Sequence, residues 1–428
     1  MRTFTIIWLG QIVSTIGTYM TEFALIIWAW ELTGSATALA LVGFFSQLPR
    51  IPITLFAGII IDCFNRKRLM ILGDAVAAVS TIAILLLYLT DNLQIWHLYL
   101  TSAVNGSFGQ IQQLAYSTSI AMIVPQQHYT RASSMGSMVH YGSAIFAPAL
   151  AGSLYPVVGL LGILLIDLTT FTVAIATLVA VNIPQPSRPD ADQQVLETLT
   201  FGLRYIWNHR GLRALLVTTA LFWFAHDLGG AIYDPMILAR TDGSAQLLGS
   251  VAASAGVGGV TGAVIISVWG GPKRRIDGML LGFIGAGLSK TVFGLGRTTF
   301  VWIPAQFCSS LNFPLLSSAE TALWMANVAP EMQGRVFAAN ALILQIVSAI
   351  AIFIAGPLAE RVFEPAMSPG GKLVSLLGGI FSSGSGAGMA VLYVITAISL
   401  LLVGCGGFAY RELQELEPIK PNRDNHTI

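Results

Sequence analysis

Several ionisable residues of this sequence lie inside long apolar segments, and four of them are candidates for proton coupling. Glu22 and Arg50 fall in the first two such segments, and the pair His226–Asp227 falls near the centre of a later one. An ionisable side chain at membrane depth is costly, so it is a candidate functional group. Glu22 could carry a proton under the control of Arg50 and of hydration, with a purely structural ion pair as the alternative. Asp227 is a second candidate proton carrier beside the imidazole of His226, with a hydrogen-bonded structural role as the alternative.

A polar face runs along the segment 95–120. Asn105, Gly109, Gln112, Tyr116 and Ser119 recur at steps of three or four residues and therefore share one side of a helix. Lipid would not tolerate this face, so it meets water or a neighbouring helix. We expect a substrate cavity there, with a polar packing seam as the alternative. The candidate cavity residues are Asn105, Gln112, Tyr116, Trp223, Glu320 and Trp324.

The composition of the chain indicates a membrane protein with many spans. Of its 428 residues, 54% are hydrophobic and 10% are charged, against about 25% charged residues in an ordinary soluble protein. The mean hydropathy is +0.72. The net charge of +1 suggests no nucleic-acid partner, and the three cysteines form neither a metal motif nor an obvious disulfide framework.

Twelve apolar runs are each long enough for a membrane helix, which needs about 20 residues. We therefore expect an all-α membrane protein with twelve transmembrane helices. If the N-terminus is cytoplasmic, sixteen Lys and Arg residues lie in inside loops and four in outside loops, so both termini are expected in the cytoplasm. The runs are 4–32, 37–61, 69–90, 95–120, 132–157, 160–183, 212–239, 245–270, 276–297, 300–327, 336–362 and 385–409.

Three sequence features recur about 209 residues apart. Gly34-Ser35-Ala36 returns as Gly243-Ser244-Ala245, Pro148 and Pro156 return as Pro357 and Pro365, and the basic cluster 66–68 returns at 273–275. These matches predict two pseudo-symmetric six-helix bundles with a substrate site between them near the bilayer midplane. The expected parts are a first bundle at 1–183, a cytoplasmic linker at 184–211, a second bundle at 212–409 and a cytoplasmic tail at 410–428. Within the linker, 195–207 could form an amphipathic helix on the inner leaflet or a solvated tether.

The loop between the second and third runs carries a motif that resembles the major facilitator superfamily, and the resemblance covers essentially the whole chain. Gly58, Asp62, Arg66 and Lys67 match the motif, whereas Cys63 stands where the family usually has Arg. The resemblance implies that Asp62 meets the start of the eleventh helix and holds the halves together on the cytoplasmic side. The conformational gating residues would be Gly58, Asp62, Arg66, Lys67, Arg68 and Arg335.

A second motif in the fifth run looks like the antiporter motif of exporters in that family. It consists of Ala147, Pro148 and Gly152, and without the family it indicates a kinkable helix with a small-residue face. Further segments are similar to the drug:proton antiporter branch that includes macrolide-efflux and enterobactin-exporter-like proteins. These segments are 23–25, 33–38 and 333–338.

The resemblance implies a proton-coupled exporter of small amphiphilic compounds, such as drugs, macrolides or siderophore-like metabolites, that works by alternating access in a bacterial inner membrane. A proton-coupled uptake permease for a polar nutrient is the alternative, and a non-transporting receptor or membrane enzyme is a remote one. The expected partners are the lipid bilayer, a small-molecule substrate and protons, with no obligate protein partner. We expect no cofactor and no catalytic or metal site, because the chain has no Walker A, His-Glu-x-x-His or paired-cysteine motif.

Overall fold

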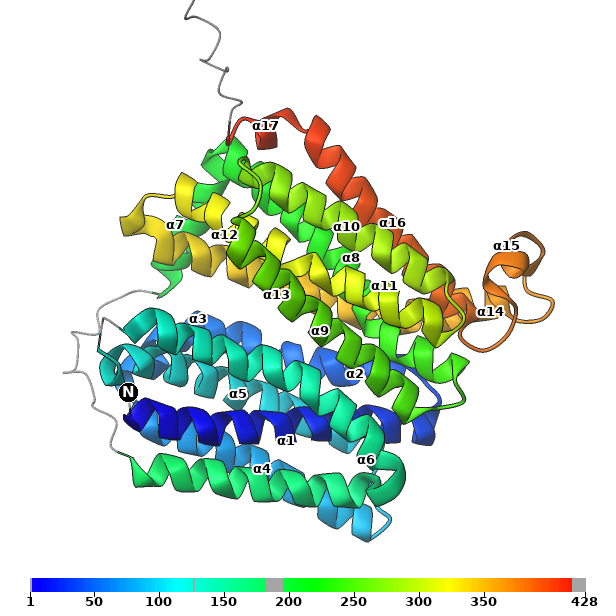
Figure 1. Ribbon diagram of the computed structural model, residues 1–428, viewed down its shortest axis with the longest axis horizontal. Coiled ribbons are helices and arrows are strands. Elements are labelled where there is room, and N and C mark those ends of the chain that lie inside the picture. Colours follow the sequence, from blue (N-terminus) through cyan, green and yellow to red (C-terminus); the bar gives the residue numbers. More distant parts are fainter. Residues whose placement is uncertain (1, 126–127, 182–194, 418–428) are drawn as a thin grey trace, which may run out of the picture.

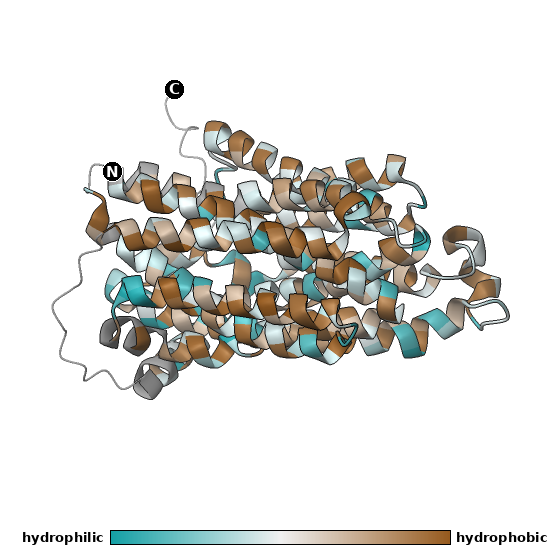
Figure 2. Cartoon of the chain, turned by 90° about the horizontal axis from the view of Figure 1, so that it is seen from below, coloured by the Kyte–Doolittle hydropathy of each residue, from teal (hydrophilic) through white to brown (hydrophobic). Residues whose placement is uncertain are grey.

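The computed structural model describes residues 2–125, 128–181 and 195–417, and these segments are helices joined by short turns (Figure 1). They contain no strand. Nine of the helical stretches in this part of the chain are long and apolar enough to cross a membrane. Figure 2 shows apolar residues along almost the full length of the helices, as a lipid-facing surface requires. The chain is therefore an all-helical, multi-pass membrane protein.

The helices gather in two groups, which Figure 1 shows one above the other with their long axes roughly parallel. We call α1–α6 the first half and α8–α17 the second half. The first half comprises α1 (Arg2–Thr33), α2 (Ala36–Gln47), α3 (Arg50–Cys63), α4 (Arg66–Leu89), α5 (Ile95–Ile123) and α6 (Tyr129–Ala180). A connecting helix, α7 (Val195–Asn208), leads to α8 (Arg210–Arg240), α9 (Ala245–Trp269), α10 (Arg275–Leu295), α11 (Thr299–Leu311), α12 (Phe313–Asn327), α13 (Pro330–Leu358), the π-helical turn η2 (Ala359–Phe363), α14 (Glu364–Met367), α15 (Val374–Phe381), α16 (Ala387–Ala409) and α17 (Arg411–Gln414).

The repeated Gly-Ser-Ala tripeptides make the same turn in both halves. Gly34 and Gly243 have φ angles of 57° and 78°, which favour glycine because it has no Cβ. Ser35 Oγ then accepts a hydrogen bond from Ala38 N at 3.0 Å, and Ser244 Oγ accepts one from Leu247 N at 3.3 Å. These caps start α2 and α9. We call this end of the molecule the Gly34 end and the opposite end, where α4 starts, the Asn65 end.

Several predicted runs are interrupted in the structure. The run 37–61 is divided between α2 and α3 at Pro49, which has no N–H to continue the hydrogen-bond ladder of α2. The run 300–327 is divided at Asn312, whose Nδ2 donates to Cys308 O at 2.7 Å. The runs 132–157 and 160–183 form one continuous element, α6, with a sharp bend at Gly159, where φ is 63°. Each bend coincides with a residue that cannot continue a regular helix or can leave it at low cost.

Small residues of the predicted antiporter-like motif lie where α6 of the first half crosses α9 of the second. Ala147 is fully buried. A Cβ atom placed on Gly152 would lie 2.8 Å from Ala245 O, and one placed on Gly249 would lie 2.6 Å from Pro148 O. The two backbones therefore approach more closely than any side chain would allow.

The second contact between the halves joins α2 and α3 to α13. A Cβ atom on Gly356 would lie 2.5 Å from the Cα atom of Thr37, and the rings of Phe44 and Phe353 lie 5.0 Å apart. The Glu360 carboxylate in η2 accepts hydrogen bonds from Thr37 N at 3.0 Å and from Thr37 Oγ1 at 2.5 Å. A carboxylate of the second half thus caps the N-terminus of α2 in the first half.

Buried apolar side chains show where the halves are joined. At the Gly34 end they form one cluster that includes Ile27 of α1, Met236 of α8 and Ala355 of α13. At the Asn65 end, the described buried side chains form clusters within single halves, one around Met70 and another around Phe283. The two halves therefore share a core at the Gly34 end.

The connecting helix α7 is packed against the second half. The Arg335 guanidinium lies 5.3 Å from the centre of the Phe201 ring, and Gly202 lies directly against the backbone of Arg335. Ile206 is buried in the core of the second half, while Trp207 is 64% exposed. This helix occupies the predicted amphipathic segment 195–207 and extends it by one residue.

Replacing Gly249 by Ala should separate α6 from α9. The added Cβ has no room beside Pro148 O, and overpacking of this kind typically costs about 1–3 kcal/mol. Thermal unfolding of the purified protein in detergent should therefore begin at a lower temperature. Gly259→Ala is the matched control, because a Cβ on Gly259 of the same helix meets no atom within 4 Å. Equal unfolding temperatures for the two variants would contradict the close α6–α9 contact.

Replacing Glu360 by Ala should loosen the halves at the Gly34 end. Losing a helix-capping carboxylate costs about 0.5–2 kcal/mol, so the population separated at this end should rise about 2- to 30-fold. Spin labels on the exposed residues Leu89 and Phe300 would report the distance between the halves. The control is Glu364→Ala, because Glu364 caps α16 within the second half by accepting from Met389 N at 2.8 Å. A distance distribution unchanged by Glu360→Ala would show that this cap does not hold the halves together.

Candidate functional site

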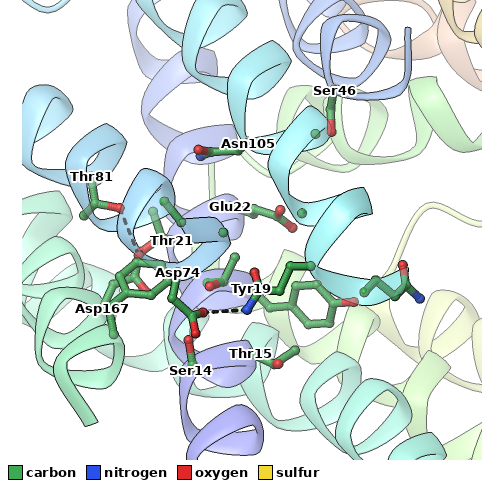
Figure 3. Close-up of a pocket in the computed structure, with 18 of the residues that line it drawn as sticks. Ser14, Thr15, Tyr19, Thr21, Glu22, Ser46, Asp74, Thr81, Asn105 and Asp167 are labelled. Atoms are coloured by element: carbon green, nitrogen blue, oxygen red, sulfur yellow. Dashed lines mark hydrogen bonds between the residues drawn. The ribbon is translucent and has the colours of Figure 1, made fainter. Parts of the chain in front are cut away.

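A polar cavity of about 360 Å³ lies among the helices of the first half. Its lining comes from α1, α2, α4, α5 and α6, together with Arg50 at the start of α3. Figure 3 shows side chains of several of these helices pointing into one space, among them Glu22 and Asn105. The volume is in the range of small-molecule sites. All of the described lining residues belong to the first half, whereas the sequence repeat predicts a site between the halves.

Glu22 and Arg50 both line this cavity. Glu22 is exposed to the cavity and accepts no hydrogen bond from the described residues. Its carboxylate is within electrostatic reach of Arg50, but the two make no ion pair within 4 Å. Arg50 Nη2 instead donates a long hydrogen bond of 3.4 Å to Ser46 Oγ. The expected direct ion pair is therefore not formed, and the Glu22 carboxylate faces open space.

The polar face predicted on 95–120 is divided between the cavity and a neighbouring carboxylate. Asn105, Gln112 and Tyr116 all line the cavity. Asn105 Oδ1 and Tyr116 Oη are buried without a hydrogen-bond partner among the described residues. Gln112 Nε2 donates to Asp74 Oδ1 at 2.7 Å, so this side chain also binds another helix. This face of α5 therefore lines the cavity and also packs against α4 through polar contacts.

Two buried carboxylates beside the cavity carry no functional prediction from the sequence. Asp74 is 2% exposed and also accepts from Gln11 Nε2 at 3.3 Å. Asp167 is 1% exposed and accepts from Thr21 Oγ1 at 2.9 Å and from Thr81 Oγ1 at 3.2 Å. An acid inside an apolar run is the signal that could have marked both residues.

In the second half, Asp227 and His226 lie in separate surroundings on α8. The Asp227 carboxyl group lies beside Ser348 of α13 and within electrostatic reach of Lys290. His226 packs its ring 4.9 Å from that of Phe313, and its Nδ1 atom is buried without a partner among the described residues. Lys290 is 7% exposed, and its ammonium lies 5.5 Å from the centre of the Tyr393 ring. The structure therefore adds Lys290 to the charged groups around Asp227.

Three predicted cavity residues of the second half lie away from the cavity described above. The Trp223 side chain of α8 lies beside the Glu320 carboxylate of α12. Glu320 is 9% exposed, and Trp324 is 3% exposed with its indole nitrogen unpartnered in the described part of the chain. Trp223 and Glu320 thus form a buried link between α8 and α12.

The basic residues of the predicted gating motif hold the Asn65 end of the first half. Arg66 Nη1 donates to Thr118 O of α5 at 3.1 Å. Lys67 Nζ donates to Val181 O, just beyond α6, at 2.6 Å. Arg68 is exposed, and its backbone N–H donates to Asn65 Oδ1 at 3.1 Å. These residues tie the start of α4 to two neighbouring helices.

Of the remaining gating residues, the structure describes the side chain of Arg335 alone. Gly58 and the Asp62 side chain lie outside the described residues. Arg335, the predicted gating residue of the eleventh run, lies over the Phe201 ring of α7. The start of α13 is therefore covered by the connecting helix.

Among the described residues, no group of three or more His, Cys, Asp or Glu side chains could hold a metal ion. The described lining of the cavity presents carboxylates, amides, hydroxyls and one guanidinium, and these groups suit hydrogen bonding and proton exchange.

The sequence model of the Major Facilitator Superfamily matches residues 7–352. Macrolide efflux protein A of Streptococcus pyogenes is 25% identical over 365 residues, which cover 84% of this chain and 90% of that protein. Multidrug efflux pump Tap of Mycolicibacterium fortuitum is 23% identical over 341 residues, which cover 76% of this chain and 82% of that protein. The inward-facing, unoccupied crystal structure of a bacterial homologue of the human lysosomal transporter Spinster superposes with a TM-score of 0.71 at 14% identity, covering 97% of this chain and 98% of that one.

The two groups of membrane helices and these similarities define a membrane transporter rather than an enzyme. The chain belongs to the Major Facilitator Superfamily. The family resemblance drawn from Gly58, Asp62, Arg66 and Lys67 is confirmed, as is the resemblance to macrolide-efflux proteins. The solved structure supports the fold alone at this level of identity.

Replacing Trp223 by Phe should destabilise the second half. The change removes a polar N–H beside the buried Glu320 carboxyl group, and leaving a buried polar group unsatisfied typically costs about 1–3 kcal/mol. Thermal unfolding in detergent measures the loss. Trp269→Phe is the control, because Trp269 is 60% exposed at the end of α9. If the two variants unfold at the same temperature, the Trp223–Glu320 contact contributes nothing to stability.

Proposed function

We propose that this transporter is a proton-coupled exporter of small amphiphilic compounds, such as drugs, macrolides or siderophore-like metabolites. The observation that carries the proposal is the Glu22 carboxyl group, which faces a polar cavity among membrane helices and accepts no hydrogen bond from the described residues. A carboxyl group at that depth is costly unless it exchanges a proton or binds a cation. Two relatives of the chain, a macrolide efflux protein and a multidrug efflux pump, support export as the direction.

In this proposal, Glu22 is the proton carrier of the first half and Arg50 controls its charge. A deprotonated Glu22 attracts the Arg50 guanidinium, and a protonated Glu22 does not. Binding of a proton therefore changes the relative energy of two arrangements of the cavity wall, which is how a ligand shifts a conformational equilibrium. Asp227 plays the same part in the second half, with His226 beside it and Lys290 as its counter-charge.

The cycle would proceed by alternating access between the two halves. We assign the Gly34 end to the outside, because sixteen of the twenty loop Lys and Arg residues of the sequence then lie in the cytoplasm. With the halves joined at the Gly34 end, the Asn65 end would be the one that opens, toward the cytoplasm. The antiporter-like residues Ala147, Pro148 and Gly152 would let α6 and α9 separate and rejoin. Asp62, with Arg335 nearby, would close the cytoplasmic side in the opposite state.

Twelve spans complete this picture. To the nine long apolar helices we add α5, the second arm of α6 after Gly159 and the pair α11–α12. The bundles would occupy 1–183 and 212–409, with a cytoplasmic linker at 184–211 and a cytoplasmic tail at 410–428. The bacterial relatives support a bacterial inner membrane as the location. The substrate cavity would include Asn105, Gln112 and Tyr116 of the first half, and in another state of the cycle Trp223, Glu320 and Trp324, which lie away from the described cavity, would join it from the second half.

Inside-out vesicles under an imposed pH gradient test the proposal. Vesicles with the wild-type protein should accumulate a fluorescent amphiphile such as ethidium when a proton gradient is applied. Glu22→Gln and Asp227→Asn should each lower gradient-driven uptake at least about tenfold, equivalent to about 1.4 kcal/mol. The control is Asp277→Asn, which makes the same chemical change on a carboxylate outside the cavity.

Full gradient-driven uptake by both Glu22→Gln and Asp227→Asn would overturn the assignment of proton coupling. Whole cells that accumulate a labelled polar solute with the gradient would instead favour the uptake permease. Absence of any flux in liposomes with an intact fold would contradict transport of the tested compound.

A further inference from the structure

A second carboxyl group lies on the wall of the same cavity and has no part in the proposal above. Asp167 belongs to the second arm of α6 and is 1% exposed, yet it is among the residues that line the cavity. Figure 3 shows it close to Thr21 and Thr81 on the side of the cavity opposite to Ser46. A carboxyl group this deep in a membrane bundle needs a physical reason to be there.

Among the described residues, the hydrogen-bond partners of the Asp167 carboxyl group are hydroxyl groups. Thr21 of α1 and Thr81 of α4 both donate to Oδ2, and Thr170 Oγ1, which donates to Asp167 O at 2.7 Å, lies 3.5 Å from Oδ1. A hydroxyl group can donate or accept a hydrogen bond. These partners can therefore satisfy Asp167 as a carboxylate and, after their hydroxyls rotate, as a protonated carboxyl group.

The other buried acid of this cavity has a different environment. Asp74 accepts hydrogen bonds from the amide nitrogens of Gln112 and Gln11. The two amide N–H groups donate to the carboxylate oxygens, so these bonds stabilise the ionised form of Asp74. Within one cavity, the surroundings of Asp167 permit a change of protonation, whereas those of Asp74 favour the ionised carboxylate.

The threonines around Asp167 also depart from the behaviour of others in the bundle. Thr15 and Thr218 donate to carbonyl oxygens one turn earlier in their own helices, at 2.7 Å and 2.8 Å. Thr21 and Thr81 instead direct their hydroxyls across to Asp167 of α6. The resulting network joins three helices at the cavity wall, next to the residue that follows Thr21 in the chain, Glu22.

Charge in the cavity gives Asp167 a connection to Glu22. The two carboxyl groups lie within electrostatic reach of each other. Among the described residues, the titratable and charged groups around the cavity are Tyr19, Glu22, Arg50, Asp74, Tyr116 and Asp167. If all three carboxyl groups were ionised, two negative charges would remain beside the Arg50 guanidinium, and protonation of one carboxyl group would reduce this excess. The cavity is large enough for several waters, at about 30 Å³ each, and waters can carry a proton between carboxyl groups.

We propose that Asp167 is a second proton-binding group of the first half and exchanges its proton with Glu22 through the cavity. In each exchange the O–H bond of one carboxyl group breaks, an O–H bond forms on the other, and no other bond changes. The inference rests on the proposed function in that Glu22 is taken to be a proton carrier. It adds that the first half stores a proton on Asp167 while Glu22 is engaged with substrate or with Arg50.

Infrared difference spectroscopy of the purified protein in lipid tests this assignment without a substrate. Spectra recorded from mildly acidic to mildly alkaline pH report the C=O stretch of each carboxyl group that loses its proton. The wild type should lose bands from both Glu22 and Asp167, and Asp167→Asn should remove one of them. In Glu22→Gln, the Asp167 band should remain but change at a different pH, because the neighbouring charge is gone. Asp277→Asn, outside the cavity, should leave these bands unaltered.

The outcomes separate this inference from the proposed function. If Glu22→Gln removes a band and Asp167→Asn does not, Asp167 holds no exchangeable proton and the inference fails alone. If Glu22→Gln also removes no band, the proton-carrier role of Glu22 fails with it. If Asp167→Asn does not fold, Thr21→Val keeps the carboxyl group but removes one hydroxyl. It should shift the frequency of the Asp167 band, and an unshifted wild-type pattern would overturn the assignment.

Discussion

Every polar group inside this bundle must find a partner or water within the protein, because hydrocarbon offers neither. That constraint accounts for the arrangement of the first half. Asp74 and Asp167 are held by amides and hydroxyls from neighbouring helices. Glu22 is left facing a cavity with Arg50 within electrostatic reach. The cavity and the acids therefore depend on each other, since the acids need a wet space and the wet space needs polar walls.

The same constraint limits how the two halves can meet. Their closest approaches are made by backbone and small residues, because apolar side chains gain little by leaving lipid for each other. Gly152 and Gly249 provide this on α6 and α9, and Gly356 does so beside Thr37.

The two sequence repeats differ in how the helix after each Gly-Ser-Ala turn meets the other half. The N-terminus of α2 is capped by a carboxylate from the other half, whereas the start of α9 is covered by the backbone of α6 around Gly152. Water competes more strongly for a charged cap than for an uncharged backbone contact. The two contacts between the halves can therefore differ in the free energy needed to separate them.

Much of the architecture could be predicted from the order of residues. Long apolar runs, Gly-Ser-Ala turns and the motif around Arg66 depend on local chemistry that survives in any context, so helical content, the repeat and the family followed from them. The breaks at Pro49 and Asn312 and the bend at Gly159 were harder to predict from the sequence, because an interrupted helix and a continuous one have the same hydropathy. The pairing of Trp223 with Glu320 and the separation of Glu22 from Arg50 could not be predicted, since similar depth in the membrane does not specify which way two side chains point.

The sequence by itself determined that this is a helical membrane protein of the Major Facilitator Superfamily, because apolar run length and a short loop motif carry that information locally. Only the tertiary structure decided that the Glu22 cavity is enclosed by the first half, that Asp167 is surrounded by hydroxyls from α1 and α4, and that Lys290 lies near Asp227. These relations join residues tens to more than a hundred positions apart. They depend on how each helix is rotated about its axis, which packing against its neighbours sets and which no segment of the chain encodes alone.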